Sequence, residues 1–476
     1  MSFEERILSE KEVVSLFEIE ENHFNDFKSK DIEGKKLSRT ISAFANASGG
    51  DVYVGIREEN DTKIKHWEGL KTIEDANGLV QMISNLLVVT NNYEVVFLKH
   101  PVLATYVLQV TIFKTQSIVY CTDGKIPYVR KGAQNLPCDT PEKIRRLELD
   151  KGISSFENEV VAESDLSDVR DSIVWKMFKN NIVPDIDAEA WLKKQRLLVG
   201  DKLTIAALLL LFSDEPQVCL AKRSSIKIFR YQTSGEAERD TLVGVPLTIE
   251  GCAYNQIYEA VKKTKEIIES IRKFQKGFEA IEYPEETLHE IITNAVLHRD
   301  YSIVTDIQIR IFDNRVEVES PGKLPGYVTV NNILTAQSAR NPKIVRLINK
   351  FPEAPNKDVG EGLNTAFEAM AKLRLKEPVI EETDNSVLVI IKHEKLASPE
   401  ELVVDYLLQN DRITNRIGRN ITGIKSENSM KRIFWKLRDA GMIYMVGAGS
   451  AAAWKKTDDF ECKVKNMDSN KKNKES

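Results

Sequence analysis

A change of hydrophobic period, from helical to alternating, occurs at two places far apart in the chain. In the first, the helical pattern of GKKLSRTISAFANA runs into Gly49-Gly50, and the alternating segment DVYVGI follows. In the second, the helix predicted for HEIITNAVL is followed by the alternating segments DIQIRIF and RVEVES. Helical spacing of apolar residues favours an amphipathic helix, whereas alternation favours a half-buried strand. Both regions therefore predict domains of the α+β class.

The chain has 476 residues, and single hydrophobic cores stop growing at about 250 to 300 residues. We therefore expect an α+β multidomain protein. Pattern and composition predict a first domain at 1–150, a connecting α/β domain at 151–280, a third domain at 281–396 and a fourth at 397–456. The charged tail at 457–476 lacks hydrophobic periodicity, and we expect it to be disordered.

Composition indicates where such a chain works. No apolar run approaches the roughly 20 residues that span a bilayer, and the charged start MSFEERILSEKEVV is not a signal peptide. Five cysteines without a C-x-x-C spacing argue against a zinc cluster and a disulfide framework. We expect a cytoplasmic protein with no membrane partner. The net charge of −5 means that any nucleic-acid surface must be a local patch.

Two polar residues in the third domain, Glu290 and Asn294, stand four residues apart and share a helix face. The carbonyl of Asn294 could ligate Mg²⁺ that also holds triphosphate oxygens. Glu290 could orient or deprotonate an attacking water. Gly360-Glu361-Gly362 precedes a helix, where backbone N–H groups can hold phosphates. The alternative for each feature taken alone is a solvated surface.

The order of these pieces resembles the GHKL-type (Bergerat-type) ATPase domain of gyrases, Hsp90 chaperones and histidine kinases, an α/β sandwich. It is most similar to the divergent form in bacterial proteins labelled helicase-related, where N-A-x-x-H-R-D-Y-S, a P-G loop, R-N-P and G-x-G follow one another. The resemblance implies ATP and Mg²⁺ as cofactors, with Asn294 as metal ligand and Glu290 as the water-activating residue. It also implies a phosphate lid at Gly360 to Gly362, and Pro321 and Gly322 near the adenine.

The third domain departs from the broader superfamily at the adenine site. The sequence ESPG at 319–322 stands where a D-x-G-x-G loop usually carries the adenine-reading aspartate. His298 and Arg299 either contact phosphate or cap the end of the helix. The chain has no G-x-x-x-x-G-K-[ST] and therefore no P-loop, which argues against a helicase motor of the usual kind.

The first domain resembles the Schlafen-type (Alba-like) domain over about residues 15–140, through A-F-A-N-x-x-G-G and the later YVRKG. One implied function is nucleic-acid binding, with phosphates held by Lys28, Lys30, Lys35, Lys36, Arg39, Arg130 and Lys131. The other is cutting. Glu21, Asp26 and Glu58 match the three acids of nuclease members, which would hold Mg²⁺ or Mn²⁺ and activate water. The alternative is that these are ordinary surface acids.

The fourth domain has the helices and the strand pair of a winged helix. SENSMKRIFWKLRDAG reads as a recognition helix that Ser426 caps and Gly441 ends. Between Arg412 and Arg438, eight lysines and arginines face one acid, a net charge of +7. We expect Lys431, Arg432 and Lys436 on this helix to contact DNA or RNA, the alternative being a module for protein contacts.

Together the domains resemble a bacterial family that joins a Schlafen-type domain to a divergent GHKL module. The resemblance implies an ATP-binding, nucleic-acid-binding protein of the bacterial cytoplasm that serves transcription regulation or phage defence. The alternatives are a metal-dependent RNase or DNase gated by ATP, and a transcription regulator with a vestigial nucleotide fold. We expect a homo-oligomer, because GHKL modules often dimerise.

Overall fold

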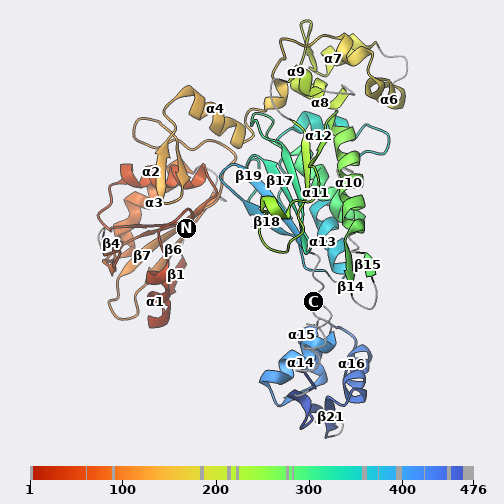
Figure 1. The fold of residues 1–476 in the computed structure, drawn as a ribbon. Helices are drawn as coiled ribbons and strands as arrows, with labels where there is room; N and C mark the ends of the chain where they lie inside the picture. Colours follow the sequence, from red (N-terminus) through yellow and green to blue (C-terminus); the bar gives the residue numbers. More distant parts are fainter. Residues whose placement is uncertain are drawn as a thin grey trace.

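Figure 1 shows the fold, a computed structural model coloured from red at the N-terminus to blue at the C-terminus. Gly360 and Glu361 of the predicted phosphate lid lie outside the described residues, as does the tail from residue 465 onward. The structure describes residues 4–59, 62–87, 92–182, 187–211, 216–220, 224–274, 278–280, 284–355, 362–373, 375–392, 399–422, 424–447, 452–461 and 463–464.

The N-terminal domain is built on a five-stranded sheet in the order β1-β6-β7-β3-β2. β6, β7 and β3 pair antiparallel, whereas β1 and β2 run parallel to their neighbours. Side chains alternate across the sheet: Val52 and Val54 pack against α2 and α3, and Tyr53 packs on the other side with α1. The elements are β1 Glu4–Ile7, α1 Glu10–Glu18, β2 Asn25–Lys28, α2 Gly34–Ala45, β3 Gly50–Val54, α3 Asn77–Leu86, β6 Tyr93–Lys99 and β7 Tyr106–Ile112.

A tight turn joins α2 to β3 and requires the predicted glycine. Gly49 has φ of +80°, and a Cβ there would lie 2.5 Å from the carbonyl oxygen of Ile112. Two hairpins extend the domain, and its last helix, α4, lies on the side of the central sheet in Figure 1. These elements are β4 Ile56–Glu58, β5 Lys65–Trp67, β8 Tyr128–Lys131, β9 Gln134–Pro137 and α4 Pro141–Asp150.

A six-stranded sheet in the order β13-β12-β16-β17-β19-β18 forms the centre of the molecule. β12 pairs parallel with β16, although α10 and α11 lie between them in the chain. One hydrophobic core joins residues from Val169 to Ile391, and α8 is buried along its whole length. The predicted domains 151–280 and 281–396 thus share one sheet and one core, and the predicted boundary at 280 does not divide the structure.

Helices cover this central sheet. α10 and α11 pack against its strands, and α13 packs on α11, whereas α6 to α9 gather at one end. The elements are α5 Ser167–Arg170, α6 Ile173–Ile182, α7 Ala188–Lys194, β10 Leu198–Val199, β11 Lys202–Leu203, α8 Ile205–Leu211, α9 Pro216–Cys219, β12 Ile226–Arg230, β13 Leu247–Ile249, α10 Ala253–Ser270, β14 Arg272–Phe274, β15 Phe278–Ala280, α11 Glu285–Leu297, β16 Ile307–Ile311, β17 Arg315–Pro321, α12 Pro342–Ile348, α13 Gly362–Lys372, β18 Val379–Glu382 and β19 Ser386–Lys392.

The C-terminal module has a core of its own, in which Phe434 stacks on Trp454 at 5.4 Å between ring centres. Its three helices and C-terminal strand pair follow the predicted order, with a short strand added, and Ser426 caps α16 as predicted. None of the helices in the described part of the chain has the length and apolarity needed to cross a membrane. The module consists of α14 Pro399–Gln409, β20 Arg412–Ile413, α15 Asn415–Thr422, α16 Glu427–Asp439, β21 Ile443–Val446 and β22 Ala453–Lys456.

Candidate nucleotide site and candidate nucleic-acid surfaces

A cavity of about 600 Å³ lies between α11, β17 and the start of α13. Glu290 and Asn294 line it from one face of α11, as their spacing predicts, and His298 lines it directly after the end of this helix. Eight residues of helix rise about 12 Å, so this row of side chains runs along the cavity. Small-molecule sites typically enclose about 300 to 1,000 Å³, and the cavity is therefore large enough for a nucleotide.

The pair at one end of the row combines a carboxylate with an amide. The amide nitrogen of Asn294 donates a 2.7 Å hydrogen bond to Glu290 Oε1. This bond leaves the amide carbonyl of Asn294 as the atom able to bind a cation. Burial raises the pKa of Glu290, an effect that the bond from Asn294 partly offsets. A raised pKa makes a carboxylate a better proton acceptor, so the pair can supply a metal ligand and a base.

His298 and Arg299 have different positions. His298 lines the cavity, but burial and the neighbouring Arg340 lower its pKa to about 4, so its ring is uncharged near neutral pH. Arg299 is buried, donates to the carbonyl of Thr305 and lies over the ring of Tyr301. The predicted phosphate contact therefore fails for Arg299, which does not line the cavity.

The P-G turn forms a wall of the cavity. The backbone N–H of Asp300 donates to Pro321 O at 2.8 Å. At Gly322, φ is +104° and a Cβ would lie 2.5 Å from the Cβ of Asp300, so only glycine fits this approach. Gly322 lines the cavity as expected, whereas Pro321 is buried behind it at the end of β17.

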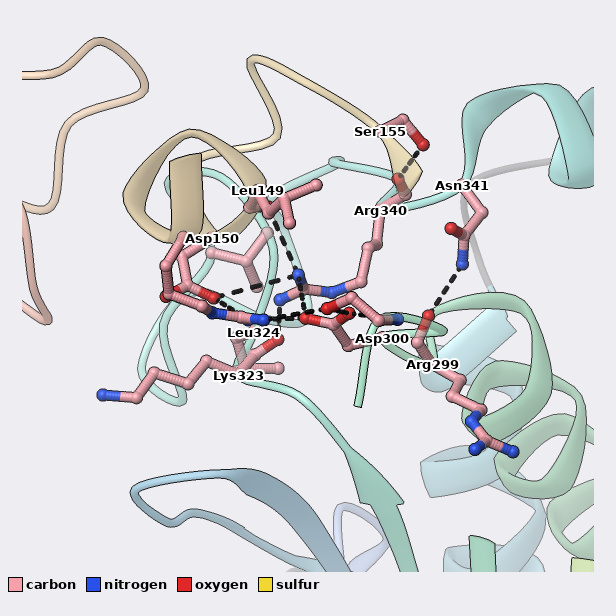
Figure 2. A network of polar contacts seen from close by, with 12 residues as sticks. Leu149, Asp150, Ser155, Arg299, Asp300, Lys323, Leu324, Arg340 and Asn341 are labelled. Carbon is pink, nitrogen blue, oxygen red and sulfur yellow. Dashed lines mark hydrogen bonds and ion pairs between the residues drawn. The ribbon is translucent and has the colours of Figure 1, made fainter. Parts of the chain in front are cut away.

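The R-N-P motif stabilises this wall of the cavity through side-chain hydrogen bonds. Arg340 Nη1 lies 3.1 Å from Asp300 Oδ2, and Asn341 donates to the carbonyls of Leu297 and Arg299 at 2.9 and 2.8 Å. Figure 2 shows Asp300, Arg340 and Asn341 within one network. The family motifs around the cavity are thus tied together by buried polar contacts that hold its shape.

Strand alternation decides which side chains of the E-S-P-G segment face the cavity. On β17, Val318 and Ser320 line the cavity, whereas Glu319 points to the opposite side and pairs with Arg310 at 2.7 Å. The Ser320 hydroxyl donates to Ala295 O at 2.7 Å. Ser320 was not among the predicted residues, although its spacing of two from Val318 along the strand was the available signal.

The three acids predicted to hold a metal in the N-terminal domain do not form a common site. Asp26 is 2% exposed and pairs with Lys28 and with Arg130, the latter at 3.1 Å. Glu58 pairs with Lys63 and Lys65 at 3.1 and 3.6 Å. Within the described ranges, no group of three or more histidine, cysteine, aspartate or glutamate side chains is placed to hold a metal ion.

Two of those acids nevertheless lie together. Burial first, and then the hydrogen bond and charge of Asp26, raise the pKa of Glu21. Glu21 also accepts from the backbone N–H of Phe27 at 3.1 Å. The structure therefore brings Glu21 next to Asp26 and leaves Glu58 with its own lysines.

The predicted basic surface of the N-terminal domain loses one member. Arg130 is 1% exposed, because it donates to Asp26 and to Asn135 inside the domain, and it cannot reach a phosphate. Arg39 pairs with Asp123 at 2.5 Å, and Lys131 with Asp384, in the turn between β18 and β19, at 3.2 Å. The exposed lysines at the start of α2 and just before it are Lys30, Lys35 and Lys36.

The predicted recognition helix α16 carries both ion-paired and exposed basic side chains. Arg432 is exposed, Lys431 pairs with Glu427 on the same helix, and Lys436 pairs with Glu400 on α14. Trp435 is 47% exposed on α16. Trp435 was not among the predicted residues, although its position next to the core residue Phe434 in a helix indicates a different face from the core.

Comparisons with known proteins identify two of the domains. Residues 21–139 match the family described as "Schlafen, AlbA_2", and residues 305–391 match "Putative ATP-dependent DNA helicase recG C-terminal". The second match begins after α11, so it does not include Glu290 and Asn294. No curated protein matches the chain.

Among solved structures, the DIP2311 protein from Corynebacterium diphtheriae is similar with 19% sequence identity and a TM-score of 0.40. The alignment covers 96% of this chain and 98% of that one. The two family matches, on a mixed α+β multidomain fold, indicate an ATP-dependent, nucleic-acid-related protein. The chain thus joins a Schlafen AlbA_2 domain at its N-terminus to a GHKL-like domain of the recG C-terminal type.

Proposed function

We propose that the chain binds ATP with Mg²⁺ in the cavity on α11 and binds nucleic acid through its N-terminal and C-terminal domains, as a regulatory or defence protein. The observation that carries the nucleotide half is the hydrogen-bonded pair of Glu290 and Asn294 inside a cavity of about 600 Å³. The pair fits the ion, because Mg²⁺ takes oxygen ligands and usually binds one or two protein groups together with phosphates and water.

The lining of the cavity supports one orientation of the nucleotide. Leu363 and Asn364 of the first turn of α13 line it, and a helix N-terminus favours phosphate. Ser320 and Gly322 line it from the end of β17. We place the phosphates beside Glu290 and Asn294 and the base beside Ser320. Bound Mg²⁺ would neutralise phosphate charge, while Glu290 would accept the proton of an attacking water.

A thermal-shift titration tests the nucleotide half. Mg·ATP should raise the melting temperature of the full chain, because a ligand that binds only the folded state stabilises it. Asn294→Ala removes the carbonyl oxygen proposed to hold the metal and should abolish the shift. Asn181→Ala, at an exposed position away from the cavity, is the matched control and should keep it. A shift that survives Asn294→Ala would place the metal elsewhere, and no shift in the unaltered protein would reject the nucleotide site.

The nucleic-acid half rests on α16 and on the lysines around the start of α2. The C-terminal module has the helices and strand pair of a winged helix, whose recognition helix enters a major groove. Lys431→Glu together with Arg432→Glu should weaken binding of a labelled DNA duplex and reduce the slope of affinity against salt, because fewer counterions are released. Unchanged affinity would assign the module to protein contacts.

The alternative function is a metal-dependent RNase or DNase. The proximity of Glu21 to Asp26 supports two members of its acid set. Against it, Lys28 and Arg130 already neutralise Asp26. Incubation with labelled RNA and DNA in Mg²⁺ or Mn²⁺, with and without ATP, separates the two. Cleavage that Glu21→Gln abolishes would establish the nuclease.

We also propose a cytoplasmic location and a homo-oligomer, by analogy with other GHKL modules. Light scattering of the purified chain, with and without Mg·ATP, tests the oligomer. A mass of one chain under both conditions would reject it.

A further inference from the structure

One short segment, residues 322–328, lies between two cavities. Gly322, Leu324 and Val328 of this segment line the candidate nucleotide cavity. Lys323 lines both this cavity and a second cleft of about 1,790 Å³ between the N-terminal domain and the central sheet. Tyr327 lines the second cleft. The wall of the nucleotide cavity is therefore also a surface that faces the N-terminal domain.

A lysine of the N-terminal domain holds this segment directly. Lys114, which follows β7, donates from Nζ to Leu324 O at 2.8 Å and to Val328 O at 3.1 Å. The backbone N–H of Leu324 in turn donates to Glu382 of β18 at 2.6 Å. Burial lowers the pKa of Lys114 to about 8, which leaves its amine mostly charged at neutral pH. The backbone of Leu324 is thus fixed from both domains at once.

Helix α4 makes a second link to the same wall. Arg146 of α4 lies 2.5 Å from Asp300, and Arg340 bridges Asp300, at 3.1 Å, to Lys323 O, at 2.6 Å. Arg340 also donates to Leu149 O of α4 at 3.2 Å. Figure 2 shows Leu149, Asp300, Lys323 and Arg340 around one centre. Asp300 and Arg340 are buried, so this link is shielded from solvent.

The contacts continue to the helix with the candidate phosphate-binding lysines. Lys151, at the end of α4, donates to Ala45 O at 2.6 Å and to Thr115 O at 2.5 Å, and it is 1% exposed. Ala45 is the last residue of α2, whose first turn carries Lys35 and Lys36. A continuous set of buried contacts therefore joins α2 to the wall of the nucleotide cavity.

We propose that nucleic acid on the N-terminal domain and nucleotide in the α11 cavity change each other's affinity through residues 322–328, with Lys114 as the main positioning residue. The inference rests on the proposed function. A ligand that fixes this segment in one arrangement also fixes the carbonyls that Lys114 holds. Coupling between two sites must be reciprocal, so each ligand must change the affinity of the other by the same factor.

A binding cycle on the full chain tests the inference. The affinity of a non-hydrolysable Mg·ATP analogue is measured with and without a labelled DNA duplex or single-stranded RNA, and then in the reverse order. We expect equal factors of about 5-fold or more in both directions. Lys114→Met keeps the aliphatic stem but removes both hydrogen bonds, and it should reduce the factor to below about 2-fold. Each ligand alone should still bind Lys114→Met with nearly unchanged affinity.

The same substitution at an exposed lysine of α1, Lys11→Met, is the matched control and should keep the full factor. Loss of affinity for one ligand with an unchanged factor would show that Lys114 has only a structural role and would overturn the inference. Binding of both ligands to the unaltered protein without coupling would also overturn it and leave the proposed function intact. Failure of either ligand to bind alone would reject the proposed function and the inference together.

Discussion

Two carboxylates at family motifs, Asp26 in the N-terminal domain and Glu290 on α11, have opposite surroundings. Asp26 is 2% exposed and contacts two cations, Lys28 and Arg130. Glu290 lines a cavity, and its hydrogen-bond partner is the neutral amide of Asn294. The first charge is satisfied within the protein, whereas the second faces space that a ligand can enter. A motif carboxylate is thus structural or functional according to its partner, which its sequence neighbours do not reveal.

The largest loss of stability should come from breaking the ion pair between Asp26 and Arg130. Arg130→Ala would remove one of the two cations that contact the buried Asp26 and leave Lys28 as the other. Breaking a buried ion pair typically costs about 3 to 5 kcal/mol, and the remaining Lys28 contact should place this loss at the lower end. Hydrogen exchange at β2 and β8 measures this loss of stability within the N-terminal domain. The adjacent and exposed Lys131→Ala is the matched control and should have a much smaller effect. A loss below about 1 kcal/mol for Arg130→Ala would contradict the structural role of this pair.

A change at Glu290 should instead affect chemistry more than stability. Glu290→Gln keeps an oxygen that can accept from Asn294 but removes the base, and general-base catalysis contributes about 10²-fold or more to rate. We expect ATP turnover to fall by that factor, whereas nucleotide binding and the melting temperature change little. Phosphate release and thermal shift on the same samples measure both. Unchanged turnover would remove Glu290 from the proposed chemistry.

The smallest effect concerns pH. Because burial raises the pKa of Glu290 above its ordinary value of 4.5, the folded state holds this proton more tightly than the unfolded state. Its contribution to stability is therefore complete below pH 4.5 and is lost as pH rises through the raised pKa. Urea unfolding across this range should show a downward slope that Glu290→Gln reduces. An equal slope in both proteins would assign it to other groups.

Features that depend on neighbours along the chain could be predicted from the sequence. The spacing of Glu290 and Asn294 placed both on one helix face, and the structure places both in one cavity. The Gly49 turn and the Ser426 cap are local in the same sense. Each depends on backbone geometry within a few residues, which the residue types themselves indicate.

Features that depend on distant partners could not be predicted. Arg130 was expected to hold a phosphate, but its partner Asp26 lies 104 residues earlier in the chain and keeps it inside the domain. The boundary predicted at 280 failed for the same reason, since β12 and β16 meet only after the chain has passed through α10 and α11. Neither contact leaves a local pattern in composition or periodicity.

The parallel pairing of β12 with β16 also determines how the protein can be divided for experiments. A fragment that begins at residue 305, where the recG C-terminal match starts, would lack β12 and leave β16 as an open strand edge. It would also lack α8, α10 and α11, whose apolar side chains fill much of the shared core. Open edges and uncovered apolar faces promote aggregation. Truncations that isolate nucleotide binding should therefore begin before Val169, the first residue of that core, rather than at the limit of the family match.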